Sequence, residues 1–374
     1  MSTAPAPTRS GGVTLRAPRV LLTVHGLIAE SAGAADVRGL VRRGDLLRPP
    51  EHTVVVYEMT AGEHRQTGVL AEVAVADYRA GHVRPHEATD PERVRRLTEH
   101  TRHTGMEQTP VLLGHAPRPA LREVLAAARS ATPVVDLATE TGEHHRAWFL
   151  DDPELCRTVH TELAGLSTLY IADGHHRLAA ADRFVTGQPE LTGDHPGLYR
   201  LGALFPQDEM RSFAYPRSVP QSMTPGGAGL LAALRNAPGT ADLTECGPAE
   251  APTQPGVAGV FAEGRWYRLT LRPVTGGAAR GTLDTVRLDE QVIHPALGPG
   301  SASPVSGVVG AVALGEWCTQ HSAVGFLPHP PSVSEVTAVA DAGEVLPAKS
   351  TWFDPKAPRG VFLRELVQPD LYPE

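Results

Sequence analysis

The chain has 374 residues, of which 41% are hydrophobic, so it can form two or three packed units at about 100 to 200 residues each. Its 37 glycines and 34 prolines fall short of a low-complexity composition, which excludes global disorder. With 34 Lys and Arg against 42 Asp and Glu, the net charge is −8. No basic field therefore covers the whole molecule, and nucleic acid is not an expected partner.

The cysteines and the lengths of the apolar segments indicate the cellular compartment. Cys156, Cys246 and Cys318 stand alone, without a CxxC pair, and indicate neither a zinc site nor a disulfide framework. No run of about 18 apolar residues occurs, and the first twenty residues lack an apolar signal segment. We therefore expect a cytoplasmic protein without a membrane partner, and the oligomeric state stays open.

In chain order, the first half is predicted to alternate strands and helices. We expect a disordered arm over residues 1–18, a strand over residues 19–24 and a helix over residues 30–41. A β-hairpin is expected next, formed by residues 54–57 and 68–75 with Gly62 in the connection. The next helix has clear end signals. Thr89 or Asp90 can cap it, Pro91 suits its first turn, and Gly105 stops it.

The alternation continues towards the middle of the chain and favours an α/β fold class. We expect strands at residues 110–113, 133–137 and 168–172, and helices at residues 118–129, 153–166 and 175–187. Residues 225–280 are rich in Gly, Ala and Pro. We accordingly expect a catalytic core over residues 19–220 and a smaller carboxyl-terminal lobe over residues 221–374.

The segment Asp173-Gly174-His175-His176-Arg177 joins the last of these strands to its helix. A helix begins with about four backbone N–H groups that lack intrahelical partners, and its dipole adds roughly half a positive charge. His175, His176 and Arg177 add donors at the same end, and Gly174 removes the Cβ that would keep a ligand from the backbone. This pattern predicts a phosphate cradle.

A plainer interpretation of the same segment stays open. In it Asp173 only caps the helix, the histidines are exposed, and Arg177 bonds a carboxylate elsewhere in the fold. Two segments of similar composition, residues 63–65 and 143–146, neither follow a buried strand nor open a helix, and we expect solvated loops there.

Two other segments carry candidate chemistry. Glu87, in Arg84-Pro85-His86-Glu87 before the capped helix, can be a general base or a charge bonded to that helix. Only two of the 34 basic residues are lysines, Lys349 and Lys356, and both lie in one short segment. Lys349 with Ser350 and Thr351 offers an ammonium and two hydroxyls to a transferring phosphoryl group, or is a surface lysine beside packed aromatics.

These three segments, in this order, resemble the bacterial domain of unknown function 1015 (DUF1015) family. The segments, in chain order, are Arg84–Thr89, Tyr170–Arg177 and Ala342–Lys356. That family is in turn similar to the free serine kinases of the ParB/sulfiredoxin-like fold. The resemblance implies a ParB-like core with elaborations, closed by a carboxyl-terminal lobe that contributes the Lys349 segment.

The resemblance also implies roles for the residues. Glu87 becomes the base, Asp173 a catalytic or magnesium-orienting acid, and the remaining residues the nucleotide cradle: Gly174, His175, His176, Arg177, Lys349, Ser350 and Thr351. Tyr215-Pro216-Arg217 stands where the family usually has Thr-His-Arg. Whether His86 and Arg217 belong to the site stays open, as do the ligands of any metal.

The sequence therefore predicts an ATP- or ADP-dependent phosphotransferase with Mg²⁺, acting on a small hydroxy amino acid. Free L-serine, giving O-phosphoserine, is the preferred acceptor. Two alternatives remain. One is a metal-dependent hydrolase whose ligands come from His86, Glu87, His175, His176 and Asp173. The other is a ParB-like sensor that binds nucleotide without turnover.

Overall fold

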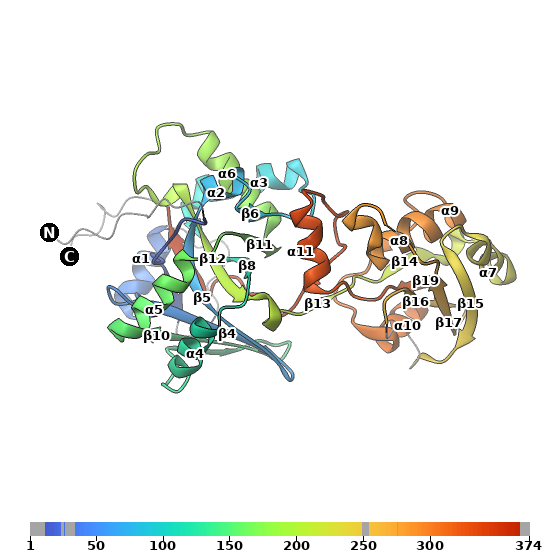
Figure 1. Ribbon diagram of the computed structural model, residues 1–374, viewed down its shortest axis with the longest axis horizontal. Coiled ribbons are helices and arrows are strands. Elements are labelled where there is room, and N and C mark those ends of the chain that lie inside the picture. The colour runs from blue at the N-terminus through green and yellow to red at the C-terminus, as the bar shows by residue number, and fades with distance from the viewer. Residues whose placement is uncertain (1–11, 24–25, 27–33, 249–253, 275, 367–374) are drawn as a thin grey trace. The chain divides into compact units, whose positions relative to one another are not determined.

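The computed structural model describes residues 12–23, 26, 34–248, 254–274 and 276–366 (Figure 1). They form two compact units. The first holds the residues up to 85, residues 89–210 and those from 354 onward, and the second holds residues 86–88 and 211–353. The chain passes from the first unit to the second after residue 210, ten residues before the boundary expected at residue 220. Residues 362–365 belong to the first unit because they pair there as a strand.

The first unit is built on one large mixed sheet. Its strands are β1 (Leu15–Arg16), β4 (Val54–Ala61), β5 (His64–Ala74), β6 (Val83–Arg84), β8 (Val111–His115), β9 (Val135–Ala138), β10 (Glu143–Leu150), β11 (Leu169–Asp173) and β12 (Tyr199–Pro206). The order is β6-β11-β8-β12-β5-β4-β10-β9, with β1 on β5. β6 pairs with β11 in parallel, and so does β8 with β12. The predicted α/β fold class is confirmed.

Helices cover this sheet and place its loops (Figure 1). They are α2 (Val75–Arg79), α3 (Pro91–Thr104), α4 (Pro119–Ala128), α5 (Pro153–Ala164) and α6 (His175–Thr186). Apolar side chains of α4 and α5, such as Leu121 and Val159, share one buried core with the sheet. The opposite sheet face is buried as well, with Tyr57 edge-on to Phe362 at 4.7 Å between ring centroids. Both faces of the sheet are therefore packed around its central strands.

A second, smaller sheet of the first unit joins distant parts of the chain. It consists of β2 (Leu21–Thr23), β3 (Leu46–Leu47), β7 (Met106–Glu107) and β21 (Phe362–Glu365), in the order β3-β2-β21-β7. Helix α1 (Ala34–Arg43) lies between β2 and β3 in the sequence. β21 pairs with both β2 and β7, which brings the end of the chain back to the first unit.

Three sequence expectations for this unit are wrong. Residues 64 and 65, expected in a solvated loop, begin β5 and pair with Ala61 and Thr60 of β4. Residues 15 and 16, assigned to the disordered arm, are a strand, because their backbone pairs with Val73 and Glu72. Residues 1–11 of that arm lie outside the described residues. Residues 143–146 are not a solvated loop but the start of β10, which pairs on one side with β4 and on the other with β9. The two-sided pairing buries His145 completely.

The second unit has its own six-stranded sheet. The strands are β14 (Arg217–Pro220), β15 (Thr240–Cys246), β16 (Val257–Ala262), β17 (Arg265–Leu271), β18 (Ser303–Pro304) and β19 (Ala323–Leu327), in the order β15-β17-β16-β19-β14-β18. Its helices are α7 (Gly227–Asn236), α8 (Asp284–Leu288), α9 (His294–Leu297), α10 (Gly310–His321) and α11 (Val333–Asp341). A two-stranded ribbon, β13 (Ser212–Phe213) with β20 (Trp352–Phe353), belongs to the same unit.

No helix within the described ranges has both the length and the apolar character that a membrane crossing needs.

Candidate active site

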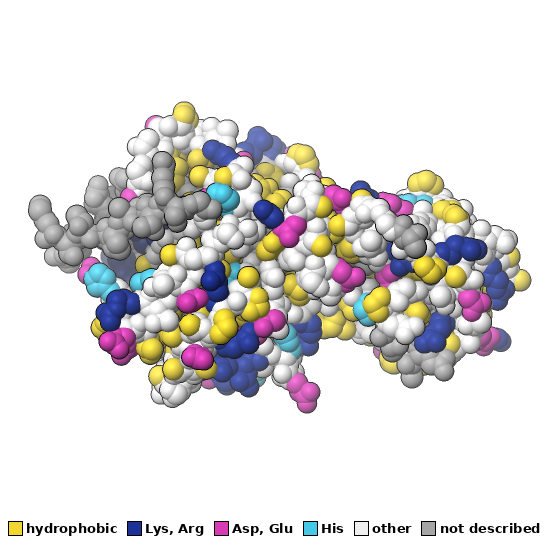
Figure 2. Space-filling view, in the orientation of Figure 1, with side chains coloured by type: hydrophobic (Ala, Val, Ile, Leu, Met, Phe, Trp, Pro, Cys, Tyr) yellow, Lys and Arg dark blue, Asp and Glu magenta, His cyan; other side chains and the backbone are white. Residues whose placement is uncertain are grey.

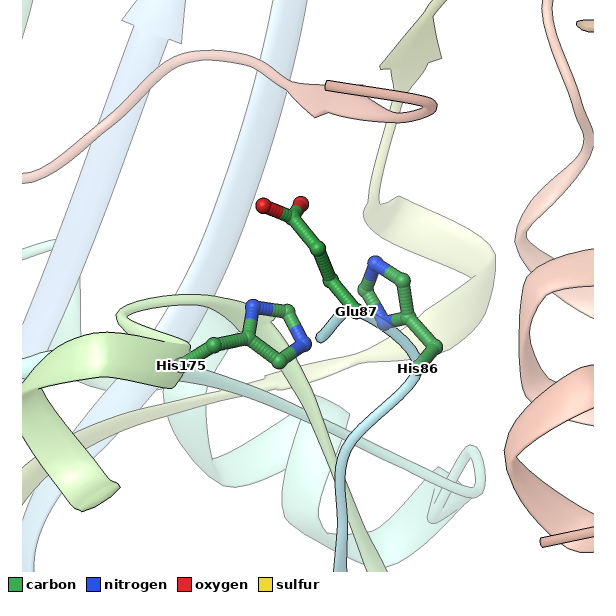
Figure 3. Close-up of side chains that lie close together, drawn as sticks. All are labelled: His86, Glu87 and His175. Atoms are coloured by element: carbon green, nitrogen blue, oxygen red, sulfur yellow. The ribbon is translucent and has the colours of Figure 1, made fainter. Parts of the chain in front are cut away.

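The turn between β11 and α6 forms around a glycine. Gly174 has φ of 104°, a left-handed conformation that L side chains rarely adopt, and it precedes His175, the first residue of α6 (Figure 3). A Cβ on Gly174 would lie 2.9 Å from the guanidinium of Arg177. The space that a Cβ would take is occupied by the guanidinium of Arg177, and the left-handed backbone also favours glycine at this position.

Asp173, the last residue of β11, is held by two cations. Its Oδ1 accepts a hydrogen bond from Lys356 Nζ at 2.7 Å, and its Oδ2 accepts one from Arg177 Nη2 at 2.6 Å. Arg177 Nη2 also donates to the carbonyl of Pro110 at 3.1 Å. Burial by itself raises the pKa of Asp173, but the charges of Arg177 and Lys356 outweigh it and hold this pKa well below its usual range. The carboxylate is thus ionised at every physiological pH.

This arrangement differs from both interpretations of the sequence. Asp173 is not the N-cap of α6, because that position belongs to Gly174, and the negative partner of Arg177 is Asp173 itself. Two cations therefore meet at one carboxylate beside the amino terminus of α6. The helix dipole adds roughly half a positive charge at this terminus.

The two histidines have different roles in the first unit. His175 is buried. The Nε2 atom of His176 accepts a hydrogen bond from the backbone N–H of Asp90 at 3.0 Å, so this nitrogen carries no proton. Asp90 is also the N-cap of α3, where its carboxylate accepts from the backbone N–H of Glu92. His176 thereby ties the start of α3 to the start of α6.

A buried ion network positions Lys356. Arg364 on β21 pairs with Glu72 at 2.7 Å and with Glu107 at 3.0 Å, and Glu107 pairs with Arg200 at 2.6 Å. Arg364 and Glu72 are fully buried, and the charge of Arg364 lowers the pKa of Glu72 against the effect of burial. The network fixes Arg364 on β21, eight residues after Lys356, and so limits where the ammonium of Lys356 can lie.

The other predicted residues are brought together within the second unit. The loop that carries His86 and Glu87 (Figure 3) pairs with Leu346 through a bridge at Glu87, and Leu346 N–H donates to the carbonyl of His86 at 2.7 Å. His86 Nε2 forms a hydrogen bond with Thr351 Oγ1 at 2.8 Å. Ser350 is buried and its hydroxyl donates to the carbonyl of Pro347 at 2.7 Å. These hydroxyls hold the Lys349 loop in shape.

Lys349 has a left-handed backbone, with φ of 63°, at the tip of this loop. Its ammonium lies 3.3 Å from the hydroxyl and 4.8 Å from the ring centroid of Tyr215. Its carbonyl accepts a hydrogen bond from Arg217 at 3.0 Å. Arg217 is buried and paired with Asp289 at 2.9 Å, so it acts on the loop by positioning Lys349.

The sequence analysis missed Lys356 as a partner of Asp173. The signal was present, because Lys356 is one of only two lysines in the chain. The structure also bears on the metal alternative. Both oxygens of Asp173 already bind cations and Nε2 of His176 accepts an N–H, so these three atoms are engaged within the protein.

Comparisons with known proteins agree with the motif resemblance. The sequence model of a family described as "Protein of unknown function (DUF1015)" matches residues 29–291, more than half of the chain, and confirms the predicted resemblance. No curated protein matches the chain.

Solved structures that resemble the chain do so at low similarity. A conserved hypothetical protein from Pyrococcus furiosus has 15% identity and a TM-score of 0.39, covering 80% of this chain and 95% of its own. A free serine kinase variant in complex with ADP has 14% identity and a TM-score of 0.38, covering 79% and 92%. SbnI from Staphylococcus aureus, truncated at its carboxyl terminus, has 14% identity and a TM-score of 0.41, covering 78% and 85%.

Proposed function

We propose that this chain, which belongs to the DUF1015 family, is a phosphotransferase that uses ATP or ADP to phosphorylate a small hydroxyl compound. Free L-serine is the preferred acceptor and O-phosphoserine the product. The observation that carries the proposal is the β11–α6 turn, in which two cationic donors, Arg177 and Lys356, are both aligned by Asp173. Phosphoryl transfer needs mainly in-line positioning and screening of negative charge, which such a turn supplies.

The proposal gives each residue of the turn a role. The backbone N–H groups at the start of α6, with Arg177 and Lys356, bind the phosphates of the nucleotide. The role proposed for Asp173 is to keep the two cations in place. The motif resemblance implies a broader role for this residue, as a catalytic or magnesium-orienting acid. The Asp173 oxygens are engaged by these cations, so magnesium is assigned to the nucleotide phosphates and no protein ligand for it is proposed.

Glu87 is the proposed general base, and chain connectivity supports it. Arg84 on β6 pairs with Tyr170 on the parallel strand β11. Glu87 lies three residues beyond Arg84, and Asp173 lies three residues beyond Tyr170. The chain that leaves β6 runs toward the sheet edge at which β11 ends, and three residues span at most about 10 Å. Asp90, three residues after Glu87, bonds His176 of α6.

The proposed reaction is balanced without a further reactant. The hydroxyl oxygen of the acceptor attacks the terminal phosphorus of the nucleotide, the bond from that phosphorus to the leaving phosphate oxygen breaks, and the hydroxyl proton passes to the carboxylate of Glu87. Of the three residues that the motif resemblance implies as further phosphate contacts, we keep Lys349, while Ser350 and Thr351 shape the loop that presents it.

The test is an assay of the full chain with ATP or ADP, Mg²⁺ and a panel of L-serine, L-threonine and L-homoserine, read by mass spectrometry of new phosphate esters. We expect O-phosphoserine with the wild type. Asp173→Asn removes the charge that aligns Arg177 and Lys356, and we expect product to fall by about 100-fold or more while nucleotide binding stays measurable.

The matched control is Asp182→Asn, a carboxylate on the same helix that pairs with Arg79 away from the turn. It is expected to leave the rate unchanged. Unaltered product formation by the Asp173 variant would remove the turn from the reaction. Saturable nucleotide binding without product from any acceptor would favour the sensor over the kinase.

A further inference from the structure

The Lys349 loop of the second unit holds a lysine where the backbone favours glycine. Lys349 has φ of 63°, in the left-handed region that L side chains rarely adopt. Its carbonyl accepts a hydrogen bond from Arg217 at 3.0 Å, and the hydroxyl of the next residue, Ser350, donates to the carbonyl of Pro347 at 2.7 Å. A strained residue that its neighbours hold in place is typical of functional sites, where the strain sets the direction of a side chain.

The ammonium of Lys349 rests on a tyrosine rather than on a carboxylate. Its Nζ lies 3.3 Å from the hydroxyl of Tyr215 and 4.8 Å from the centroid of the ring, within the range of a cation–π contact. On the face shown in Figure 2, Lys and Arg side chains are interspersed with Asp and Glu side chains. Lys349, in contrast, forms no ion pair with any residue that the structure describes. An ammonium has three N–H donors, so two of them remain for an anion.

Arg217 joins the backbones of Tyr215 and Lys349. Its Nη1 donates to the carbonyl of Tyr215 at 3.2 Å and to the carbonyl of Lys349 at 3.0 Å. Arg217 is itself buried and paired with Asp289 at 2.9 Å. One fixed guanidinium therefore sets the spacing of two residues that lie 134 positions apart in the sequence.

The ring of Tyr215 is fixed by packing. The side chain is buried, and its ring stacks on Trp352 with centroids 5.5 Å apart and 22° between the planes. Trp352 begins β20, which pairs with β13, and β13 ends two residues before Tyr215. The ribbon therefore anchors both Tyr215 and the Lys349 loop. Tyr215 is a rigid support, whereas a lysine side chain without one samples many rotamers.

We propose that Tyr215 is a positioning residue that presents the ammonium of Lys349 to a phosphate group, a role that rests on the proposed function. The ring and the hydroxyl of Tyr215 restrict the lysine before the ligand arrives, so less rotamer freedom is lost on binding. The two remaining N–H donors of Lys349 form charge-assisted hydrogen bonds with phosphate oxygens, which are roughly twice as strong as neutral ones.

The chain has only two lysines, so the contact can be observed directly. Labelling the full chain with ¹³C at lysine Cε gives two methylene signals in a proton–carbon NMR spectrum, and Lys349→Arg assigns one of them by removing it. An aromatic ring shifts the proton signal of a group above its face upfield. We expect the Lys349 signal to move downfield in Tyr215→Leu, to stay upfield in Tyr215→Phe, and to shift saturably when ADP and Mg²⁺ are added to the wild type.

The energetic test is isothermal titration of the full chain with ADP and Mg²⁺. We expect Tyr215→Leu to weaken ADP binding about threefold to tenfold, whereas Tyr215→Phe, which keeps the ring, stays within about twofold of the wild type. In the Lys349→Met background Tyr215→Leu should have no further effect, because no ammonium remains to be positioned. Tyr267→Phe removes the hydroxyl of another buried tyrosine of the second unit, and this matched control should bind ADP as the wild type does.

The role of Tyr215 is overturned if the Lys349 signal has the same position in the wild type and in Tyr215→Leu. It is equally overturned if Tyr215→Leu weakens ADP binding as much in the Lys349→Met background as alone, since the effect would then be structural. A wild type that binds no ADP would overturn the proposed function and this role together. Bound ADP with an unchanged Lys349 signal would overturn the role of Tyr215 and leave the proposed function standing.

Discussion

Asp173 shows how the partners of a residue, more than its type, decide its role. The sequence predicts an acid at this position, and the structure surrounds it with Arg177 and Lys356. Arg177 lies four residues away and its pairing follows from helical spacing. Lys356 lies 183 residues away, and only the rarity of lysine in this chain marks it. The candidate residues were therefore predictable as a motif, whereas their ion pairs required the fold.

His145 gives a residue-scale prediction for pH. It is fully buried on β10, with Nδ1 2.9 Å from the Tyr57 hydroxyl and Nε2 3.8 Å from a Glu143 oxygen. Burial, with a smaller effect of His144, lowers its pKa to about 4 from an ordinary value of 6.5. The unfolded chain therefore binds a proton before the folded chain does. The stability contributed by neutral His145 is complete above pH 6.5 and decreases as the pH falls toward 4.

The measurement is the free energy of unfolding in urea at pH 7 and pH 5. We expect His145 to account for a decrease of about 2 kcal/mol between these pH values. His145→Gln should be less stable at pH 7 but should show a smaller decrease. His144→Gln, the exposed neighbour on the same strand, should retain the wild-type decrease. An equal decrease in all three proteins would show that other groups cause it.

At the scale of elements, the sequence predicted those that carry their own end signals. The helix from Pro91 to Thr104 has Asp90 as its cap and a left-handed Gly105 at its end, both as expected. The β4–β5 hairpin and the strand before α6 are also confirmed. Short strands such as β1, β7 and β21 have two to four residues, too few for a periodic pattern. Their pairing partners, rather than local sequence, define them.

The β11–α6 connection provides a prediction at this scale. Gly174→Ala places a Cβ on a left-handed backbone and 2.9 Å from Arg177, so strand and helix cannot keep their junction without strain. We expect a loss of about 1 to 2 kcal/mol in the free energy of unfolding, measured by urea denaturation. Gly165→Ala also meets a guanidinium, that of Arg118 at 3.3 Å, but its φ is −79°. A loss as large in this control would assign the effect to crowding rather than to the backbone.

At the scale of the whole molecule, the sequence predicted two parts but not how the chain divides between them. Composition marks the second unit, which is rich in Gly, Ala and Pro over residues 225–280. The return of the chain to the first unit depends on Arg364, which pairs with Glu72, 292 residues earlier. Such a pairing has no local signature, because any buried charge needs a partner but the sequence does not say which.

The claim that the β11–α6 turn binds the phosphates of a nucleotide is tested most directly by the backbone amides themselves. The measurement is a titration of the isotopically labelled full chain with ADP and Mg²⁺, followed by transverse-relaxation-optimised NMR of assigned amides. We predict saturable shifts of the Gly174, His175, His176 and Arg177 amides, with His115 at the far end of β8 unaffected. ADP binding that leaves the four amides of the turn unshifted would contradict the account.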